Sequence, residues 1–129
     1  MLETGILNPK INELLSRVRH TNTLVIADRG FPFWPEVETI DISLVDGIPT
    51  VLQVLQAIRE NFHIGAIFLT KEFRAANSDA VLRAFDQAME GVPVVYEPHI
   101  HFKERVPKAI GLIRTGDTTP FANMILESE

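Results

Sequence analysis

The segment Leu24-Val25-Ile26-Ala27 is a short apolar run that ends at the carboxylate of Asp28. A continuous run of this kind predicts a strand that is buried on both faces of a sheet. The residues before it predict a helix that begins at Pro9, after Asn8 as the N-cap. The apolar stripe of this helix has the spacing i, i+3, i+4 and i+7 and consists of Ile11, Leu14, Leu15 and Val18. The chain therefore begins with an amphipathic helix followed by a buried strand.

Two more amphipathic helices are expected further along the chain. One follows Thr50 as its cap and carries an apolar stripe that reaches Phe62. The other lies between a Ser78 cap and Gly91, a residue typical of helix ends. The polar segment 97–107 is expected to be partly helical at most.

Strands alternate with these helices. They are predicted at residues 37–44, 64–69, 92–96, 110–113 and 122–126. Pro93 favours an edge position or a strand start for its segment, because proline cannot donate to a neighbouring strand. The short loop at 115–120 favours an antiparallel pairing of the last two strands. The alternation predicts an α/β fold with three layers, in which helices cover both faces of a mixed, mostly parallel sheet.

Length and composition limit the functional classes. The 129 residues, with 46% hydrophobic and 22% charged side chains, predict one globular domain over residues 1–129. The absence of cysteine excludes disulfides, Cys-ligated metals and thiol catalysis. A net charge of −5 with scattered Lys and Arg argues against a nucleic-acid partner. Without a signal peptide or a run of ~20 apolar residues, we expect no membrane partner and a cytoplasmic location.

Histidines and one aspartate are the first candidates for chemistry. His20 and Asp28 bracket the first predicted strand, so local geometry need not bring them together. Each also has a structural interpretation, His20 as a cation at a helix end and Asp28 as a turn residue. His99 and His101 would share a face if their segment is extended, which would make a partial metal site. A zinc site needs at least three protein ligands, so we expect no metal here.

Common nucleotide and hydrolase motifs are absent. The hydroxyl-rich loop 115–119 lacks the Gly-Lys-Ser/Thr of a phosphate-binding loop, and no dinucleotide fingerprint or Gly-x-Ser-x-Gly occurs. The aromatic cluster of Phe31, Phe33 and Trp34 lies between prolines. It could pack on the core, stack on a sugar or form a subunit contact, and we favour the subunit contact.

The order of several short motifs resembles the D-ribose pyranase and L-fucose mutarotase family over nearly the whole chain. These motifs are Gly5-Ile6-Leu7-Asn8, His20-Thr21 with Ile26-Ala27-Asp28, Ile40-Asp41 with Ser43-Leu44, Gly47-Ile48-Pro49, His99 with Phe102-Lys103, and Ile113-Arg114-Thr115-Gly116-Asp117 with Thr119-Pro120 and Ala122-Asn123. His99 and Lys103, and the ending Pro120-x-Ala122-Asn123, are closer to the ribose branch.

The resemblance implies a cofactor-free isomerase that interconverts ring forms of a free monosaccharide, D-ribose first. It implies that His20 is the general acid/base, since a neutral imidazole can give and take protons near pH 7. It also implies homo-oligomers, often a decamer of two pentameric rings, with sites close to subunit contacts. The substrate-binding residues that it implies are Asp28, His99, Lys103, Phe121, Ala122 and Asn123.

Three positions depart from the family pattern. Arg19 stands where the family usually has Gly, Asn22 where it has Asp, and Phe121 where it has Tyr. The Phe121 ring lacks the hydroxyl that could bond to a sugar oxygen. Two alternatives therefore stay open: a mutarotase for L-fucose or another sugar, and a sugar-binding homologue without activity.

Overall fold

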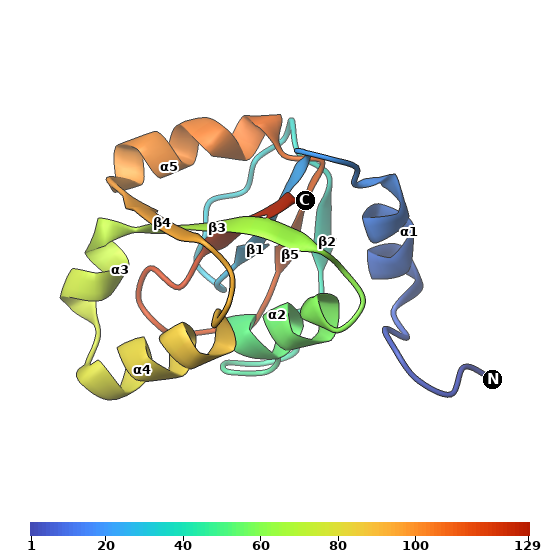
Figure 1. Cartoon of the computed structure of the whole chain (residues 1–129), viewed down its shortest axis with the longest axis horizontal. Helices are drawn as coiled ribbons and strands as arrows, with labels where there is room; N and C mark the ends of the chain where they lie inside the picture. The colour runs from blue at the N-terminus through green and yellow to red at the C-terminus, as the bar shows by residue number, and fades with distance from the viewer.

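The apolar run Leu24-Val25-Ile26-Ala27 lies in strand β1 (Thr23–Ala27), near the middle of a six-stranded sheet, in a computed structural model that describes residues 1–129 (Figure 1). The strand order is β2-β5-β1-β6-β3-β4. The other strands are β2 (Thr39–Asp41), β3 (Ile64–Thr70), β4 (Val94–Glu97), β5 (Gly111–Arg114) and β6 (Met124–Ser128). The helices are α1 (Pro9–Arg17), α2 (Val51–Arg59), α3 (Lys71–Ala76), α4 (Asp79–Ala88) and α5 (His99–Arg105), followed by the 3₁₀ turn η1 (Val106–Lys108).

The sheet is mixed and mostly parallel, as the sequence predicts. Strand β1 runs parallel to β5, β5 to β2, and β3 to β4. Strand β6 runs antiparallel to both of its neighbours, β1 and β3. The prediction that the last two strands pair with each other is wrong, because β6 is inserted on the other side of β1 from β5. The edge position expected from Pro93 is confirmed, since β4 ends the strand order.

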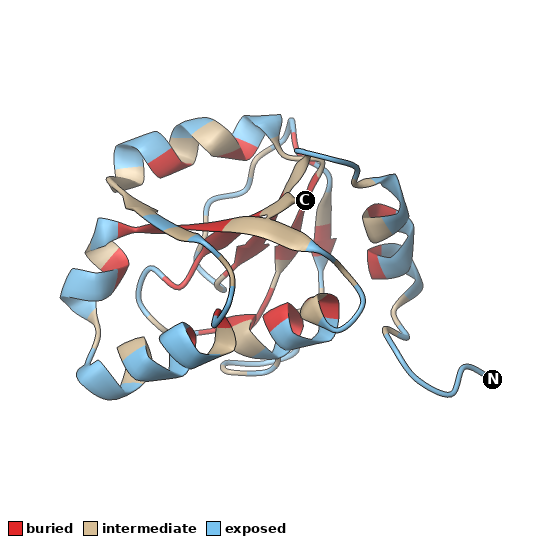
Figure 2. Ribbon diagram, viewed as in Figure 1, coloured by how far each residue is buried: buried red, intermediate tan, exposed pale blue.

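Helices cover both faces of the sheet, which confirms the three-layer prediction (Figure 1). Residues from α1, α2, α3 and α4 pack with one face of the strands in a cluster of 18 buried side chains. On the other face, α5 and the segment around Val37 close a cluster of 8 buried side chains. Alternate residues of β1 belong to the two clusters. Leu24 and Ile26 pack in the cluster of 18, and Val25 and Ala27 pack in the cluster of 8. The buried residues lie along the strands and the inward faces of the helices in Figure 2.

Local signals explain most helix starts. The Asn8 side chain accepts hydrogen bonds from the backbone of Lys10 and Ile11, and Thr50 forms a capping box with Gln53. The Ser78 side chain caps α4 by accepting the backbone N–H of Val81.

The structure departs from the sequence prediction in three elements. The strand predicted at residues 37–44 is shorter in the structure and spans only Thr39–Asp41. Helix α3 was not expected, and the segment after Pro98 is a full helix, α5. None of the helices combines the length and apolar character that crossing a membrane requires.

Candidate functional site

Asp28 and Asn123 meet at the edge of the sheet where the parallel strands end. Asp28 follows β1 directly, and Asn123 precedes β6, whose opposite direction brings its start to the same edge. The Asp28 backbone N–H donates to Asn123 Oδ1 at 2.7 Å, and Asn123 Nδ2 donates to Asp28 Oδ2 at 3.3 Å. Two residues 95 positions apart in the chain are thus held side to side. Loops after parallel strands are where α/β folds commonly bind small ligands.

Burial raises the pKa of the Asp28 carboxyl above its usual range. Hydrogen bonds from the Gly30 N–H, the Asn123 amide and the Phe31 N–H act in the opposite direction, and the nearby Asp117 charge adds to the rise. The Gly30 N–H donates to Asp28 Oδ1 at 3.0 Å. The carboxylate is therefore held in a fixed direction while part of its hydration is removed, which suits an acceptor for a neutral polyol.

His99 and Phe121 form the second half of this edge. His99 is the first residue of α5, and its ring lies edge-on to the ring of Phe121, with centroids 5.6 Å apart and an interplanar angle of 81°. The His99 ring also lies nearly parallel to that of Phe102, at 6.3 Å. Its Nδ1 atom is buried and has no hydrogen-bond partner in the chain. Phe121 has a left-handed backbone, with φ of 55°, and its side chain is partly exposed.

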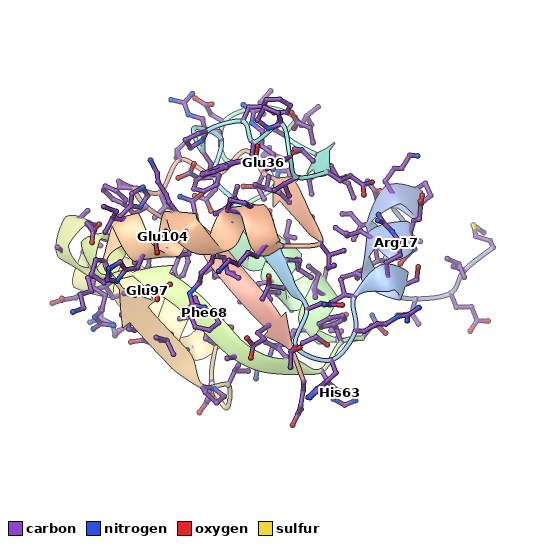
Figure 3. All side chains as sticks on the ribbon, turned by 90° about the horizontal axis from the view of Figure 1, so that it is seen from above. Arg17, Glu36, His63, Phe68, Glu97 and Glu104 are labelled. Carbon is purple, nitrogen blue, oxygen red and sulfur yellow. The ribbon has the colours of Figure 1, made fainter.

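Helix α5 is fastened to the sheet by Arg105. Its Nε donates to Glu97 Oε1 at 2.6 Å, and its guanidinium lies 4.0 Å from the centre of the Phe68 ring. Figure 3 shows Phe68 and Glu97 beside this helix. Lys103, one turn after His99 on the same side of the helix, is half-buried.

The remaining histidines do not join this edge. Because α5 is helical, His101 projects from a different side of it than His99, and the prediction of a shared face is wrong. His63 lies far from α5 in Figure 3. No group of three or more His, Asp or Glu side chains in the structure is arranged to hold a metal ion.

A buried polar loop supports the Asp28 side of the edge, and the sequence did not single out its role. Asp117, only 4% exposed, accepts the N–H of Val51 on Oδ2 at 2.8 Å and that of Thr119 on Oδ1 at 2.7 Å. Thr115 Oγ1 donates to the carbonyl of Ala27 at 2.7 Å, one residue before Asp28. The signal was present in Thr115-Gly116-Asp117, where small and polar residues follow a buried strand. Ala122, fully buried, ties the other end of this loop into the core.

His20 lies at the opposite edge of the sheet. It is exposed and precedes β1, and the next residue, Thr21, has φ of 65° and donates its N–H to the Ser128 carbonyl at the end of β6. The five residues of β1 separate His20 from Asp28. At ~3.3 Å per residue this is roughly 16 Å of strand. Within one chain the two side chains therefore lie too far apart to contact the same small ligand.

The aromatic cluster divides between core and surface. Phe31 and Trp34 stack at 6.5 Å and pack against the α5 side of the core, whereas Phe33 is 76% exposed. Phe33 lines a groove of about 450 Å³ next to the ion pair of Arg114 with Asp41, which measures 2.8 Å. Packing on the core therefore accounts for two of the three rings.

The chain is similar to known proteins over nearly its whole length. A D-ribose pyranase of Geobacillus kaustophilus is 44% identical over 128 residues, covering 99% of this chain and 93% of the relative. The structure of Bacillus subtilis RbsD complexed with D-ribose superposes with a TM-score of 0.92 at 31% identity, covering 99% of this chain and 97% of the other. A Streptococcus pneumoniae fucose mutarotase in complex with L-fucose shares the fold, with a TM-score of 0.83 at 21% identity and coverage of 98% and 97%. The family model described as the RbsD / FucU transport protein family matches residues 1–129, and the chain belongs to that family.

Proposed function

We propose that this protein is an isomerase that interconverts the pyranose and furanose forms of free D-ribose. The full-length match to D-ribose pyranases carries this proposal. The edge formed by Asp28, Asn123, His99 and Phe121 supports it, because it offers acceptors, a donor amide and an imidazole to a neutral polyol.

The reaction needs only proton transfers. A base removes the proton of the anomeric hydroxyl while an acid protonates the ring oxygen, and the C1–ring-oxygen bond breaks to give the open-chain aldehyde. Another hydroxyl then attacks the aldehyde carbon and gives up its proton while the carbonyl oxygen takes up a proton, which closes the other ring. Asp28 would accept from sugar hydroxyls, Asn123 would hold its carboxylate, and His99 and Lys103 would add contacts from α5.

His20 would enter the site from a neighbouring subunit. We propose this because β1 separates His20 from Asp28 in one chain, while His20 itself is exposed. The proposed assembly is a ring-shaped homo-oligomer, a decamer of two pentameric rings, in which His20 of one copy is the general acid/base for the Asp28 edge of the next. A cytoplasmic location is part of the same proposal, and the lack of cysteine fits a reducing compartment.

Saturation-transfer NMR between the ring forms of D-ribose tests the activity directly. The intact protein should raise the exchange rate in proportion to its concentration, and His20→Ala should abolish the increase. No increase with the intact protein would contradict an isomerase. Unchanged exchange with His20→Ala would contradict only the role of His20.

Mixed oligomers test the shared site. His20→Ala and Asp28→Asn subunits are each expected to be inactive alone. Refolded together in equal amounts, they should recover about a quarter of the wild-type sites, since each composite site draws one residue from each subunit. Failure to recover activity, in mixtures shown by native mass spectrometry to be mixed, would contradict the sharing.

A panel of free sugars separates the alternatives. D-ribose should give the largest rate increase, and a preference for L-fucose would favour a fucose mutarotase instead. Phe121 motivates the non-catalytic alternative, for which calorimetry would show ribose binding without any increase in exchange.

A further inference from the structure

Helix α3 lies beside the proposed sugar site and holds the start of α5. The Glu72 carboxylate accepts the His99 backbone N–H at Oε2, at 2.8 Å. The preceding residue, Pro98, has no side chain that can accept this N–H, and α5 has no side-chain cap of its own. A carboxylate from another helix therefore fixes the direction in which the His99 side chain leaves the backbone.

Asn77, directly after α3, holds the segment that carries Phe121, on the other side of the proposed site from His99. Its Nδ2 donates to the Pro120 carbonyl at 2.9 Å and to the Phe73 carbonyl at 2.8 Å. Pro120 precedes Phe121, whose left-handed backbone aims its ring at the edge of His99. The bond to Pro120 therefore ties the Phe121 turn to α3.

The helix that carries these two groups is itself anchored in the core. Phe73 is fully buried and packs against Phe85, with ring centroids 4.6 Å apart. Thr70, 1% exposed, accepts the Phe73 N–H at 3.1 Å and begins the helix. Both groups therefore extend from a rigid support rather than from a loose loop.

We propose that Glu72 and Asn77 are positioning residues of the sugar site, which set the distance and tilt between His99 and Phe121. The inference rests on the proposed function for its kinetic readout. The two rings meet nearly at right angles, and the buried His99 Nδ1 has no hydrogen-bond partner in the chain. Loss of either hydrogen bond, that of Glu72 to the His99 N–H or that of Asn77 to the Pro120 carbonyl, would let one ring move away from the sugar. Neither loss would remove a group that touches the sugar.

Glu72→Ala tests the hydrogen bond between Glu72 and the His99 backbone. It should raise the KM for D-ribose about three- to tenfold, the effect of one lost hydrogen bond, while kcat changes less. Glu72→Gln keeps an acceptor oxygen and should stay close to wild type. The His99 amide should lose hydrogen-exchange protection in Glu72→Ala but keep it in Glu72→Gln.

Asn77→Ala and Asn77→Asp test the hydrogen bond between Asn77 and the Pro120 carbonyl. Both lose the N–H donor, so both should raise KM to a similar extent and shift the ring resonances of His99 and Phe121. Retention of the wild-type KM and ring shifts in both variants would overturn the role of Asn77.

Ser78→Ala is the matched structural control. It removes a cap from α4, which carries none of the proposed sugar contacts, so it should lower stability in urea while KM stays unchanged. An equal rise of KM in Ser78→Ala, or an unchanged KM in Glu72→Ala, would overturn the inference. If the wild type does not accelerate ring exchange of D-ribose, the proposed function is contradicted. The hydrogen-exchange protection of the His99 amide would still decide whether Glu72 holds His99.

Discussion

Gly116 is the position where a single methyl group should disturb the support of the site most. A Cβ atom added there would lie 2.6 Å from the Ile48 carbonyl oxygen and 3.1 Å from its carbon. These atoms belong to the backbone of the turn at Val45–Ile48, so no side-chain rotation can relieve the contact. The turn must move away from the Thr115–Asp117 loop.

The cost follows from the bonds that this movement breaks. The Gly47 N–H donates to the Gly116 carbonyl at 2.6 Å, and the Gly116 N–H donates to the Pro49 carbonyl at 2.9 Å. Two backbone hydrogen bonds are worth about 1–3 kcal/mol together, and forcing extra volume into a packed site adds about 1–3 kcal/mol. Gly116→Ala should therefore lower the free energy of unfolding by about 2–6 kcal/mol.

Urea unfolding followed by circular dichroism measures this loss, with Gly30→Ala as the control. A Cβ at Gly30 would lie 3.9 Å from Asp28 Oδ1, an ordinary contact, so this variant should stay within about 1 kcal/mol of wild type. A loss below about 0.5 kcal/mol in Gly116→Ala would refute the reasoning, because surface changes without a structural role cost no more.

Three further outcomes are expected. Phe121→Tyr should tighten D-ribose binding by about 0.5–1.5 kcal/mol in calorimetry, through one added hydrogen bond, and an unchanged Kd would contradict this. Burial raises the pKa of Asp28, so its contribution to stability is fully present below its ordinary pKa and is lost as the pH rises through the raised value. The free energy of unfolding of Asp28→Asn, measured in urea, should therefore rise relative to that of the wild type as the pH increases across that interval. A difference between the two proteins that does not change with pH would contradict this prediction. Asp117→Ala leaves the Val51 and Thr119 N–H groups unbonded and should lower the unfolding free energy by about 2–5 kcal/mol, whereas a change under 1 kcal/mol would contradict its supporting role.

Periodicity predicted the long helices and the buried strand because each carries a repeated apolar stripe. It missed α3, which has six residues and one buried side chain, Phe73, too few to show a period. It underestimated α5 for a similar reason, since only Phe102 is buried among its seven residues. Helices of this length depend on tertiary contacts, such as the Glu72 bond to His99, that local patterns do not contain.

The site shows the same division between local and distant information. The position of Asp28 after a buried strand was predictable, and so was its separation from His20 by that strand. Its pairing with Asn123 was not, because the sequence does not indicate that β6 inserts between β1 and β3. The roles of Glu72 and Asn77 were also missed, since both act through neighbours that are distant in the chain.

The central place of β6 has a consequence for how the molecule folds. The strands β2, β5 and β1 form one half of the sheet and β3 with β4 the other, and only β6 joins them. Because β6 follows all the other strands in sequence, a growing chain can build two partial sheets but cannot unite them until residue 128 has been synthesised. Until then, the facing edges of β1 and β3 are unpaired and open to other chains. The pairing of Asn123 with Asp28 would then arise in the same step that closes the sheet, so that only completely folded chains would present a sugar site.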